Sequence, residues 1–441
     1  MSLRELRPAP DPLEALAAVA HLPHVSFLDG AAHPSGMGRW SYLAHSPSEV
    51  IEASAEEWPV VRDRLRAERT EGRGRRVEDF PPFQGGWIGW FAYELGRAFD
   101  RQPVAARATQ QIPDISLARY DTLLAWDHGT GRCWTIGERR VESEGWRERV
   151  KPPFSTLRPP PSGLHPRLAS SLSQAEYRRA VERIIAYIRA GDLFQANLTQ
   201  QFRMPFSGDR LALYHALRRR APGSHAAWLD RGPVAVLSMS PERYLRYDAA
   251  TRAVETRPIK GTRPRDADPL RDAALAAELV ASEKDRAENV MIVDLLRNDL
   301  HRVALPESVA VPALCALETH AVVHHLVSVV TAELAPDRDA CDLLEATFPG
   351  GSISGAPKLR ATEVIAELEP VRRGIYCGAI GWLGEDGSLE LNIAIRTVVL
   401  ADGMATVGAG GGITALSDPD AEYQESLDKA NALLAAIAEA S

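Results

Sequence analysis

Cysteine is scarce in this sequence, and its few cysteines form no motif. Four residues, Cys133, Cys315, Cys341 and Cys377, lie far apart in the chain, with no CxxC pair and no spacing typical of a metal site. This pattern excludes a disulfide scaffold and a cysteine-based metal centre. We therefore expect buried, reduced thiols.

Targeting and membrane signals are also missing. The first residues include Arg4, Glu5 and Arg7 and contain no apolar stretch of the kind found in signal peptides. No apolar run approaches the length of a membrane span. Together these absences predict a cytoplasmic protein.

An excess of positive charge is absent as well. The net charge is −8 at pH 7 and the isoelectric point is near 5.9. The chain as a whole therefore has no attraction for nucleic acid or for anionic membranes. Any anionic ligand must be bound by a local cluster of arginine, lysine and backbone N–H groups.

The composition is that of a globular protein. The 441 residues, 45% of them hydrophobic and 25% charged, suffice for one large domain or for two to three ordinary ones. Residues 152–173 are rich in proline and serine, which favours a linker. We expect an N-terminal region over 1–151 and a catalytic region over 174–441.

Several segments carry clear secondary-structure signals. Ser173 and Glu176 form a capping box before a helix, and Asp418 with Pro419 begins the last helix. Asp386-Gly387 and Asp402-Gly403 are typical of hairpin turns. Further strands are expected over 83–91, 192–202, 233–247, 253–260, 375–384, 388–400 and 404–413, and one or two helices over 269–300. The fold class is therefore α+β, with a large antiparallel sheet flanked by helices.

Two glycine-rich segments resemble nucleotide-binding loops but fail their tests. Residues 350–358, GGSISGAPK, lack the Gly-Lys-Ser/Thr ending of a phosphate-binding loop, and 408–412, GAGGG, lack the G-x-G-x-x-G spacing. Both can still bind an anion. A helix beginning at Pro357 would aim the N–H groups of 354–356 at a carboxylate. The alternative is that both segments are tight turns only.

A candidate nucleophile is Lys260, within the segment TRPIKGTR. Arg257 and Arg263 flank it, and crowding by guanidinium groups disfavours the charged ammonium form. The free amine that results can attack carbon. The alternative is a solvated surface lysine.

A candidate metal site is formed by acidic residues on two predicted helices. Glu422, Glu425 and Lys429 share one face of the last helix, and Glu288 lies on an earlier one. Carboxylates from two helices are hard oxygen ligands suited to Mg²⁺. Surface ion pairing is the alternative.

These segments together resemble the chorismate-utilising enzymes, and most closely the aminodeoxychorismate synthase component I branch of that family. The resemblance is near-continuous over 170–441 and reaches into 83–97. It is carried by DLFQANLTQ (192–200), LSMSPERYL (237–245), TRPIKGTRPR (256–265), SEKDRAENVMIVDLLRNDL (282–300), VVHHLVS (322–328), FPGGSISGAPKLRATEVIAELEP (348–370), YCGAIGWL (376–383), NIAIRT (392–397), GAGGGI (408–413), AEYQESLDKAN (421–431) and FQGGWIGWFAYELGR (83–97).

The resemblance implies a sandwich of large antiparallel sheets flanked by helices, and a set of site residues. Glu288 and Glu425 match magnesium ligands, with Glu422 nearby. Arg396, Lys429 and the backbone of Gly410 and Gly411 match positions that bind the carboxylates of chorismate, and Tyr376 lines its ring. Further substrate contacts implied are Gln195, Gly261, Thr262, His325, Ser354 and Gly355.

The resemblance also implies a reaction. Lys260 matches the nucleophile that adds to C2 of chorismate as the C4 hydroxyl leaves, and Glu242 matches the general acid for that hydroxyl. Ammonia then attacks C4 and expels the lysine, which gives 4-amino-4-deoxychorismate for p-aminobenzoate and folate biosynthesis. The sequence has no glutaminase Cys-His-Glu module, so a glutamine amidotransferase subunit or free ammonium would supply the nitrogen.

Two positions separate this activity from related ones. Anthranilate synthases usually carry alanine where Lys260 stands, and isochorismate and salicylate synthases carry a lysine base where Gln195 stands. A neutral amide cannot be that base. The tryptophan-binding signature of feedback-inhibited relatives is absent from 26–30, so tryptophan binding is not expected. The alternatives are an anthranilate synthase component I-like enzyme and a non-catalytic nucleotide-binding module.

Overall fold

The fold consists of two large antiparallel β-sheets packed face to face. The computed structural model describes residues 2–30, 38–67, 80–100, 103, 107–137, 168–320 and 323–441. One sheet has the strand order β1-β8-β7-β3-β2-β11-β12-β21-β22-β10-β18, with β9 beside β10. The other has the order β15-β17-β14-β13-β20-β19-β5-β6-β4, with β16 beside β17. The predicted α+β class is confirmed.

The elements have the following bounds. The strands are β1 (Leu3–Leu6), β2 (Ser26–Asp29), β3 (Trp40–Ala44), β4 (Glu49–Ala53), β5 (Gly86–Phe91), β6 (Ile115–Tyr120), β7 (Leu123–Asp127), β8 (Arg132–Ile136), β9 (Ala169–Ser170), β10 (Gln195–Pro205), β11 (His225–Asp230), β12 (Ala235–Ser240), β13 (Arg243–Tyr247), β14 (Ala253–Thr256), β15 (Ile259–Pro264), β16 (Ala310–Thr319), β17 (Val323–Glu333), β18 (Gly355–Ala356), β19 (Ala379–Gly384), β20 (Leu389–Ile393), β21 (Thr397–Ala401) and β22 (Met404–Ile413). The α-helices are α1 (Pro12–Val19), α2 (Trp58–Ala67), α3 (Gly96–Phe99), α4 (Gln174–Arg189), α5 (Arg210–Arg220), α6 (Pro269–Ala281), α7 (Glu283–His301), α8 (Ala340–Thr347), α9 (Lys358–Leu368) and α10 (Pro419–Ala440). Short 3₁₀ turns are η1 (Ala55–Glu57), η2 (Tyr93–Leu95), η3 (Pro306–Ser308) and η4 (Gly351–Ile353).

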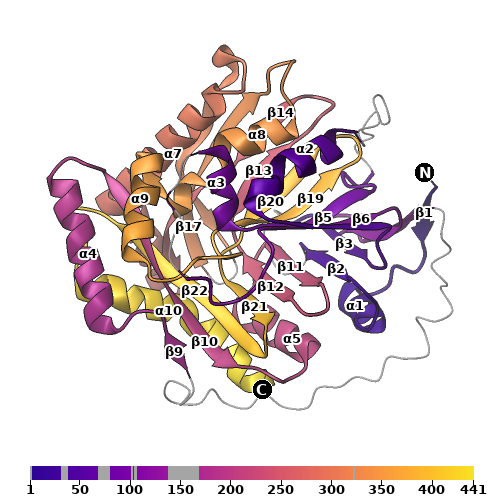
Figure 1. The fold of residues 1–441 in the computed structure, drawn as a ribbon, viewed down its shortest axis with the longest axis horizontal. Coiled ribbons are helices and arrows are strands. Elements are labelled where there is room, and N and C mark those ends of the chain that lie inside the picture. The colour runs from indigo at the N-terminus through magenta and orange to yellow at the C-terminus, as the bar shows by residue number, and fades with distance from the viewer. Residues whose placement is uncertain are drawn as a thin grey trace.

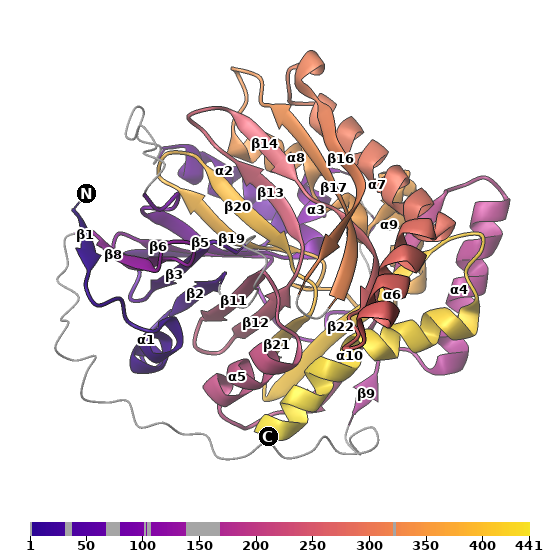
Figure 2. The same ribbon diagram turned by 180° about the vertical axis from the view of Figure 1, so that it is seen from behind.

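Helices cover the outer faces of both sheets. Side chains of α2, α7 and α8 pack on the ten-stranded sheet, and those of α1, α5 and α10 pack on the twelve-stranded sheet. A third apolar cluster, which includes Trp90, Trp134 and Trp382, lies between the two sheets. Figures 1 and 2 show the N-terminal strands at one end of this arrangement and α4 with α10 at the other.

The N-terminal and C-terminal parts of the chain share both sheets. In the larger sheet β2 pairs with β11, and in the smaller one β5 pairs with β19. The expected boundary between 1–151 and 174–441 stays a prediction, and most of the expected linker, 152–173, falls outside the described residues. Strand pairing on both sides of it makes the two regions one hydrogen-bonded structure in the described part.

Most predicted local signals are confirmed. Ser173 caps α4 through a capping box with Glu176, and Asp418 caps α10 with Pro419 in its first turn. The segment 269–300 forms two helices, α6 and α7. Both Asp-Gly turns connect the two strands of an antiparallel hairpin, β19 with β20 and β21 with β22.

Some predicted strands are shorter than expected. The expected strand over 388–400 is divided at Arg396, whose φ of 49° is left-handed. The strand expected over 233–247 is broken at Pro241 and Glu242, and the one over 253–260 is broken at Pro258. Proline removes a ladder donor, and a left-handed residue turns the chain out of the sheet, so each break moves a polar side chain away from the pleat.

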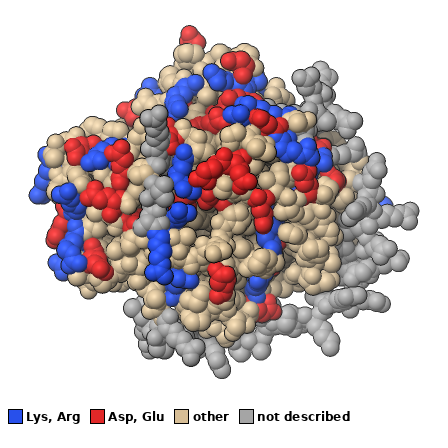
Figure 3. Space-filling view, in the orientation of Figure 1, with Lys and Arg blue, Asp and Glu red and all other residues tan. Residues whose placement is uncertain are grey.

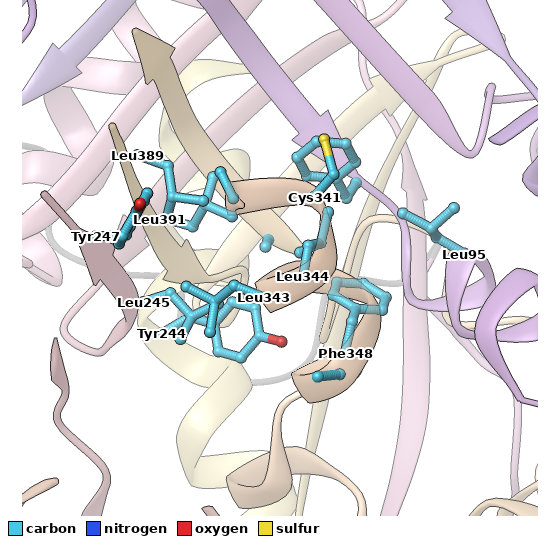
Figure 4. Close-up of a cluster of buried hydrophobic side chains, with 14 of the residues drawn as sticks. Leu95, Tyr244, Leu245, Tyr247, Cys341, Leu343, Leu344, Phe348, Leu389 and Leu391 are labelled. Carbon is cyan, nitrogen blue, oxygen red and sulfur yellow. The ribbon is translucent and has the colours of Figure 1, made fainter. Parts of the chain in front are cut away.

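The core beneath α8 shows how densely these layers pack. Tyr244 and Leu245 of β13, Leu391 of β20 and Phe348 after α8 meet in one apolar cluster (Figure 4). Cys341 belongs to it, and all four cysteines of the chain are buried and free. The expectation of buried, reduced thiols is therefore confirmed.

Charged side chains of both signs share the face of the molecule drawn in Figure 3. Lysine and arginine are interspersed there with aspartate and glutamate. Within the described residues, none of the helices combines the length and the apolar character needed to cross a bilayer.

The seam between β5 and β6 depends on a glycine. A Cβ on Gly89 would lie 1.8 Å from the carbonyl oxygen of Ser116 on the neighbouring strand, and backbone cannot move aside as a side chain can. We expect Gly89→Ala to lower the free energy of unfolding by about 1–3 kcal/mol or more. Urea denaturation measures this. Gly129→Ala, in a turn where the nearest atom is 3.2 Å away in a side chain, is the control. Equal stability of the two variants would contradict the close approach.

Candidate active site

A cavity of about 490 Å³ opens where the ends of the two sheets meet α7 and α10. Strand β15 and strand β17 line it from the smaller sheet, strand β22 and strand β10 from the larger sheet. The predicted residues that line it are Glu242, Lys260, Gly261, Thr262, Glu288, His325, Tyr376, Arg396, Gly410, Gly411, Glu422, Glu425 and Lys429. Side chains from widely separated segments of the sequence are thus brought to one place.

Lys260 lies in this cavity, half-buried on β15. Its Nζ donates a hydrogen bond to the carbonyl oxygen of Ser352 at 3.1 Å. A Cβ placed on Gly412 would lie 3.6 Å from the same Nζ. The amine therefore reaches across from the edge of one sheet to the glycine-rich strand of the other. The alternative of a surface lysine in solvent is wrong.

The expected crowding of Lys260 by arginines needs correction. Arg257 forms an ion pair with Glu318, and Arg263 forms ion pairs with Glu278 and Asp285. Their positive charges are balanced by these carboxylates. What surrounds the lysine is acidic, because Lys260 acts electrostatically on Glu242, Glu288 and Glu425.

Glu242 sits between β12 and β13 as a buried carboxyl facing the cavity. Burial raises its pKa to about 7, against a hydrogen bond from the Ser352 side chain and the charges of Lys260 and Arg396, which lower it. A carboxyl with a pKa near 7 is protonated in a useful fraction at neutral pH. It can therefore donate a proton.

His325 and Tyr376 form part of the wall. The Nδ1 atom of His325 lies 2.9 Å from the hydroxyl of Thr262, on the paired strands β17 and β15. The ring of Tyr376 lies where a Cβ on Gly408 would meet it at 2.3 Å. A glycine is required there for the ring to lie flat against the strand.

The segment GAGGG lies within β22, so the strand expected over 404–413 is confirmed and the alternative of a tight turn is wrong. Residues 408–412 belong to β22 and pair with β10, with Gly410 opposite Thr199 and Gly412 opposite Asn197. A Cβ on Gly412 would meet the amide of Gln195 at 1.9 Å. The glycines therefore let side chains from other elements lie directly against the strand, as the absence of Cβ allows.

Three carboxylates from α7 and α10 meet two lysines at the mouth of the cavity. Lys284 lies 3.4 Å from Glu422, and Lys429 lies 2.6 Å from Glu425. Burial raises the pKa of Glu288, against Lys260 and Lys284, which lower it. Burial also acts to raise the pKa of Glu425, but Lys429 and the other lysines hold that pKa below its ordinary value.

The acidic group offers carboxylate oxygens of Glu288, Glu422 and Glu425 to a divalent cation. In the described part of the chain, no three His, Cys, Asp or Glu side chains are close enough to hold a metal by themselves. A Cβ on Gly411 would lie 3.1 Å from Glu422 and 3.5 Å from Glu425. The glycine leaves space between strand and carboxylates, and Mg²⁺ keeps waters and takes few protein ligands. The carboxylates are hard oxygen donors of the kind that Mg²⁺ takes, and two of them, Glu422 and Glu425, are here paired with Lys284 and Lys429.

Arg396 supplies the cavity with an uncompensated positive charge. Its guanidinium makes no ion pair with any residue in the ranges that the structure describes, and burial lowers its pKa from the usual value, against Glu242, which raises it. Lys429 lies on the other side of β22 and donates to the carbonyl of Gly410 at 2.9 Å. A partly buried guanidinium that lines the cavity and has no ion pair within the described residues favours an anionic ligand such as a carboxylate.

Three predicted contacts do not line the cavity. Gln195 is buried beside Gly412, with its Oε1 lacking a hydrogen-bond partner in the described structure. Ser354 is buried and donates to the carbonyls of Gly350 and Gly351, and Gly355 packs against the backbone of β10. The N–H groups of 354–356 were expected to face a carboxylate. Instead this segment continues into β18, which pairs with β10, and α9 begins one residue later than expected, at Lys358.

Asn197, Lys284 and Ser352 are polar residues of the cavity that the sequence interpretation did not single out. Asn197 lies within the motif 192–200, Lys284 within 282–300 and Ser352 within 348–370, and all three line the site. Lys284 could have been found from its spacing to Glu288, one helical turn along the same helix. The backbone oxygen by which Ser352 accepts from Lys260 has no such signal, because every residue carries one.

A second cavity, of about 380 Å³, lies against β2 near the segment where the tryptophan signature is absent. Asp29 of that strand is buried and bonded to Arg218 and Tyr214. That tryptophan is not bound stays a prediction.

Comparison with known proteins gave three kinds of match. A family model described as chorismate binding enzyme matches residues 29–435. The chain is 39% identical over 434 residues to aminodeoxychorismate synthase component 1 of Salmonella typhimurium, covering 95% of this chain and 94% of the relative. It is 38% identical over 440 residues to anthranilate synthase component 1 of Thermus thermophilus, covering 97% and 95%. The crystal structure of anthranilate synthase component I from Streptococcus pneumoniae aligns with a TM-score of 0.77 at 31% identity, over 90% of this chain and 92% of that one.

The hydrogen bond from Ser352 to Glu242 yields a prediction about the free protein. The bond stabilises the ionised carboxylate, so Ser352→Ala should raise the pKa of Glu242 above the value of about 7. Titration of ¹³C-glutamate-labelled protein by NMR measures it, with the signal assigned by its loss in Glu242→Gln. A wild-type midpoint near 4.3, the value of a solvated glutamate, would contradict the buried environment.

Proposed function

Because the chain belongs to the chorismate binding enzyme family, we propose that it is an aminodeoxychorismate synthase of the component 1 type. It would convert chorismate and ammonia to 4-amino-4-deoxychorismate and water, the step toward p-aminobenzoate and folate. The observation that carries the proposal is that Lys260 and Glu242 both form a hydrogen bond with Ser352. The Lys260 amine bonds to the carbonyl oxygen of Ser352, and the Glu242 carboxyl bonds to its side chain.

The first step would use both groups. The Nζ lone pair of Lys260 forms a bond to C2 of chorismate, the two ring double bonds shift, and the C4–O bond breaks. The leaving hydroxyl takes the proton of Glu242 and departs as water. A carboxyl with a pKa near 7 suits this role.

The second step returns the two ring double bonds to their original positions. Ammonia forms a bond to C4, the double bonds return, and the C2–N bond to Lys260 breaks. The lysine leaves as an amine, and Glu242 recovers a proton from the ammonia nitrogen. Net, chorismate exchanges its C4 hydroxyl for an amino group.

Substrate binding would rest on the cations of the cavity. Arg396 and Lys429, which line the cavity, would bind the two carboxylates of chorismate, and Tyr376, which lies against Gly408 of β22, would line its ring. Glu288, Glu422 and Glu425 would hold Mg²⁺, which supplies charge neutralisation and a fixed point for a substrate carboxylate. His325, held by Thr262, would contact the substrate from the opposite wall.

The nitrogen would come from a partner. Relatives named component 1 imply a second component, and the sequence itself lacks a glutaminase module. We propose a glutamine amidotransferase subunit as the source, with ammonium salts able to replace it in the test tube.

An anthranilate synthase component 1-like activity is the second candidate. It is favoured by the 38% identity to the Thermus thermophilus relative, almost as high as that to the aminodeoxychorismate synthase. Lys260 distinguishes the two. Product identification by liquid chromatography and mass spectrometry, from chorismate, Mg²⁺ and ammonium, decides between them: anthranilate as the product would overturn the first proposal.

The role of Lys260 makes a direct prediction. Lys260→Ala removes the nucleophile, so the rate of 4-amino-4-deoxychorismate formation should fall by about 10³-fold or more while the fold persists. Steady-state kinetics with ammonium measure it, and circular dichroism checks the fold. Arg178→Ala, which removes an exposed charge paired with Asp420, is the control and should keep the wild-type rate. Undiminished turnover in Lys260→Ala would exclude the covalent role.

The proposed metal ligands can be tested without measuring turnover. Glu425→Gln should weaken Mn²⁺ binding, used as a paramagnetic probe for Mg²⁺, by about tenfold or more. The matched control is Glu439→Gln on the same helix, whose carboxylate is paired with Arg219 and Arg220 away from the cavity. Electron paramagnetic resonance of free Mn²⁺ gives both affinities. The same affinity in both variants would refute the assignment.

A further inference from the structure

One cation lies behind the cavity without touching it. The side chain of Arg373 is only 2% exposed, and Arg373 does not line the cavity. Its Nε and Nη2 donate to the two carboxylate oxygens of Glu369, at 2.9 and 2.7 Å. Such a fork-to-fork pair fixes the plane of the guanidinium.

The remaining N–H groups of Arg373 connect two segments of the site. Nη1 donates to the carbonyl oxygen of Ile353 at 2.7 Å, and Nη2 donates to the carbonyl oxygen of Asn197 at 2.6 Å. Ile353 ends the turn η4, and Asn197 lies on β10. One planar group therefore sets the distance between the turn and the strand.

The turn η4 holds both reactive groups. Its middle residue is Ser352, whose carbonyl accepts from Lys260 and whose side chain bonds to Glu242. The backbone bonds inside the turn are long, with Ile353 N to Gly350 O and Ser354 N to Gly351 O both at 3.4 Å, beside one side-chain bond from Ser354 to Gly350 O at 3.0 Å. Shorter bonds come from outside, from Arg373 to Ile353 O and from Asn197 N to Ser354 O at 2.8 Å. The turn thus depends on external support for its position.

Glu369 extends the same support to the substrate-facing strands. Its Oε1 accepts from the backbone N–H of Thr199 at 2.8 Å and from the Thr199 hydroxyl at 2.9 Å. Thr199 stands opposite Gly410 in the pairing of β10 with β22. The pair Glu369–Arg373 therefore fixes the reactive turn relative to the strand that carries the expected carboxylate contacts.

Tyr93 and Glu94, from the N-terminal part of the chain, contact Arg373 on the side away from the cavity. The guanidinium of Arg373 lies 4.6 Å from the ring centre of Tyr93, and the backbone N–H of Arg373 donates to Glu94 at 3.0 Å. Both contacts are buried. Movement of Arg373 away from η4 is opposed on the side opposite to the cavity.

We propose that Arg373 is a positioning residue for the amination, which places Lys260 and Glu242 through the Ser352 turn. This proposal rests on the proposed function for its rate measurements. A lysine cannot replace the arginine, because an ammonium is a point donor that cannot bond a carboxylate in parallel and reach two carbonyls at once. Without the bond from Arg373 to the carbonyl of Ile353, the turn could shift. The Ser352 carbonyl that accepts from Lys260 would then move, and Glu242, which bonds to the Ser352 side chain, would move with it.

The test compares Arg373→Lys with Asp299→Asn. The control weakens the other buried ion pair next to α9, in which Lys358 bonds to Asp299 at 2.6 Å and to the carbonyl of Thr347 at 2.7 Å. Within the described residues, neither side chain of that pair bonds to η4 or β10, so the control measures what a general loss of stability does. Thermal denaturation, kcat and KM for chorismate with ammonium, and the NMR titration of Glu242 are recorded for each variant.

A positioning role predicts a specific pattern. Arg373→Lys should lower kcat by about 10- to 100-fold, as a displacement near 1 Å does, with KM changed far less. The midpoint of the Glu242 titration should move, and it should stay in place in Asp299→Asn even where that variant melts earlier. If Arg373→Lys does not fold, Glu369→Gln, which keeps one acceptor for Thr199, carries the same comparison.

A purely structural role predicts the opposite. Then Arg373→Lys would melt earlier but keep its kcat per folded molecule and its Glu242 midpoint, and the proposal would be overturned. Failure of the proposed function is separate, because it would show as a wild-type protein that forms no 4-amino-4-deoxychorismate, while the NMR comparison would still decide the role of Arg373.

Discussion

The meeting of two sheet ends at the turn η4 is the constraint on which the site depends. Lys260 comes from the edge of the smaller sheet and Gly408–Gly412 from the larger one, and they approach each other only because the sheets pack face to face. Ser352 of this turn accepts a hydrogen bond from the Lys260 amine, and β18, which follows the turn, pairs with β10, the neighbour of β22. Without that junction Lys260, Glu242 and the glycine-rich strand β22 would belong to separate surfaces.

Lysine is rare in this sequence, and most of the lysines line the cavity. The five lysines of the chain are Lys151, Lys260, Lys284, Lys358 and Lys429, although lysine and arginine together number 51. Three of the five line the cavity. Arginine serves where a fixed charge is sufficient, as in the pair with Glu369. Lysine also forms ion pairs here, as Lys358 does with Asp299, but an amine can lose its proton far more readily than a guanidinium.

The sequence predicted the local elements and most of the site, and it failed where the answer depends on packing. The caps at Ser173 and Asp418 follow from neighbours three residues away, so they are readable in the chain. The partners of Arg257 and Arg263 are carboxylates brought close by folding, and no spacing in the sequence indicates them. The same is true of GAGGG, whose glycines are explained by Tyr376 and Gln195 pressing against a strand. Backbone acceptors such as the Ser352 carbonyl leave no sequence signal at all.

The most direct test of the covalent mechanism is to trap its intermediate. Protein incubated with chorismate and Mg²⁺ without ammonia, then quenched and digested, should yield a peptide containing Lys260 that is heavier by chorismate less one water. Tandem mass spectrometry should place the added mass on the lysine side chain, and ammonium added before quenching should remove it. Efficient amination with no such adduct at any quench time would contradict the nucleophilic role of the Lys260 amine.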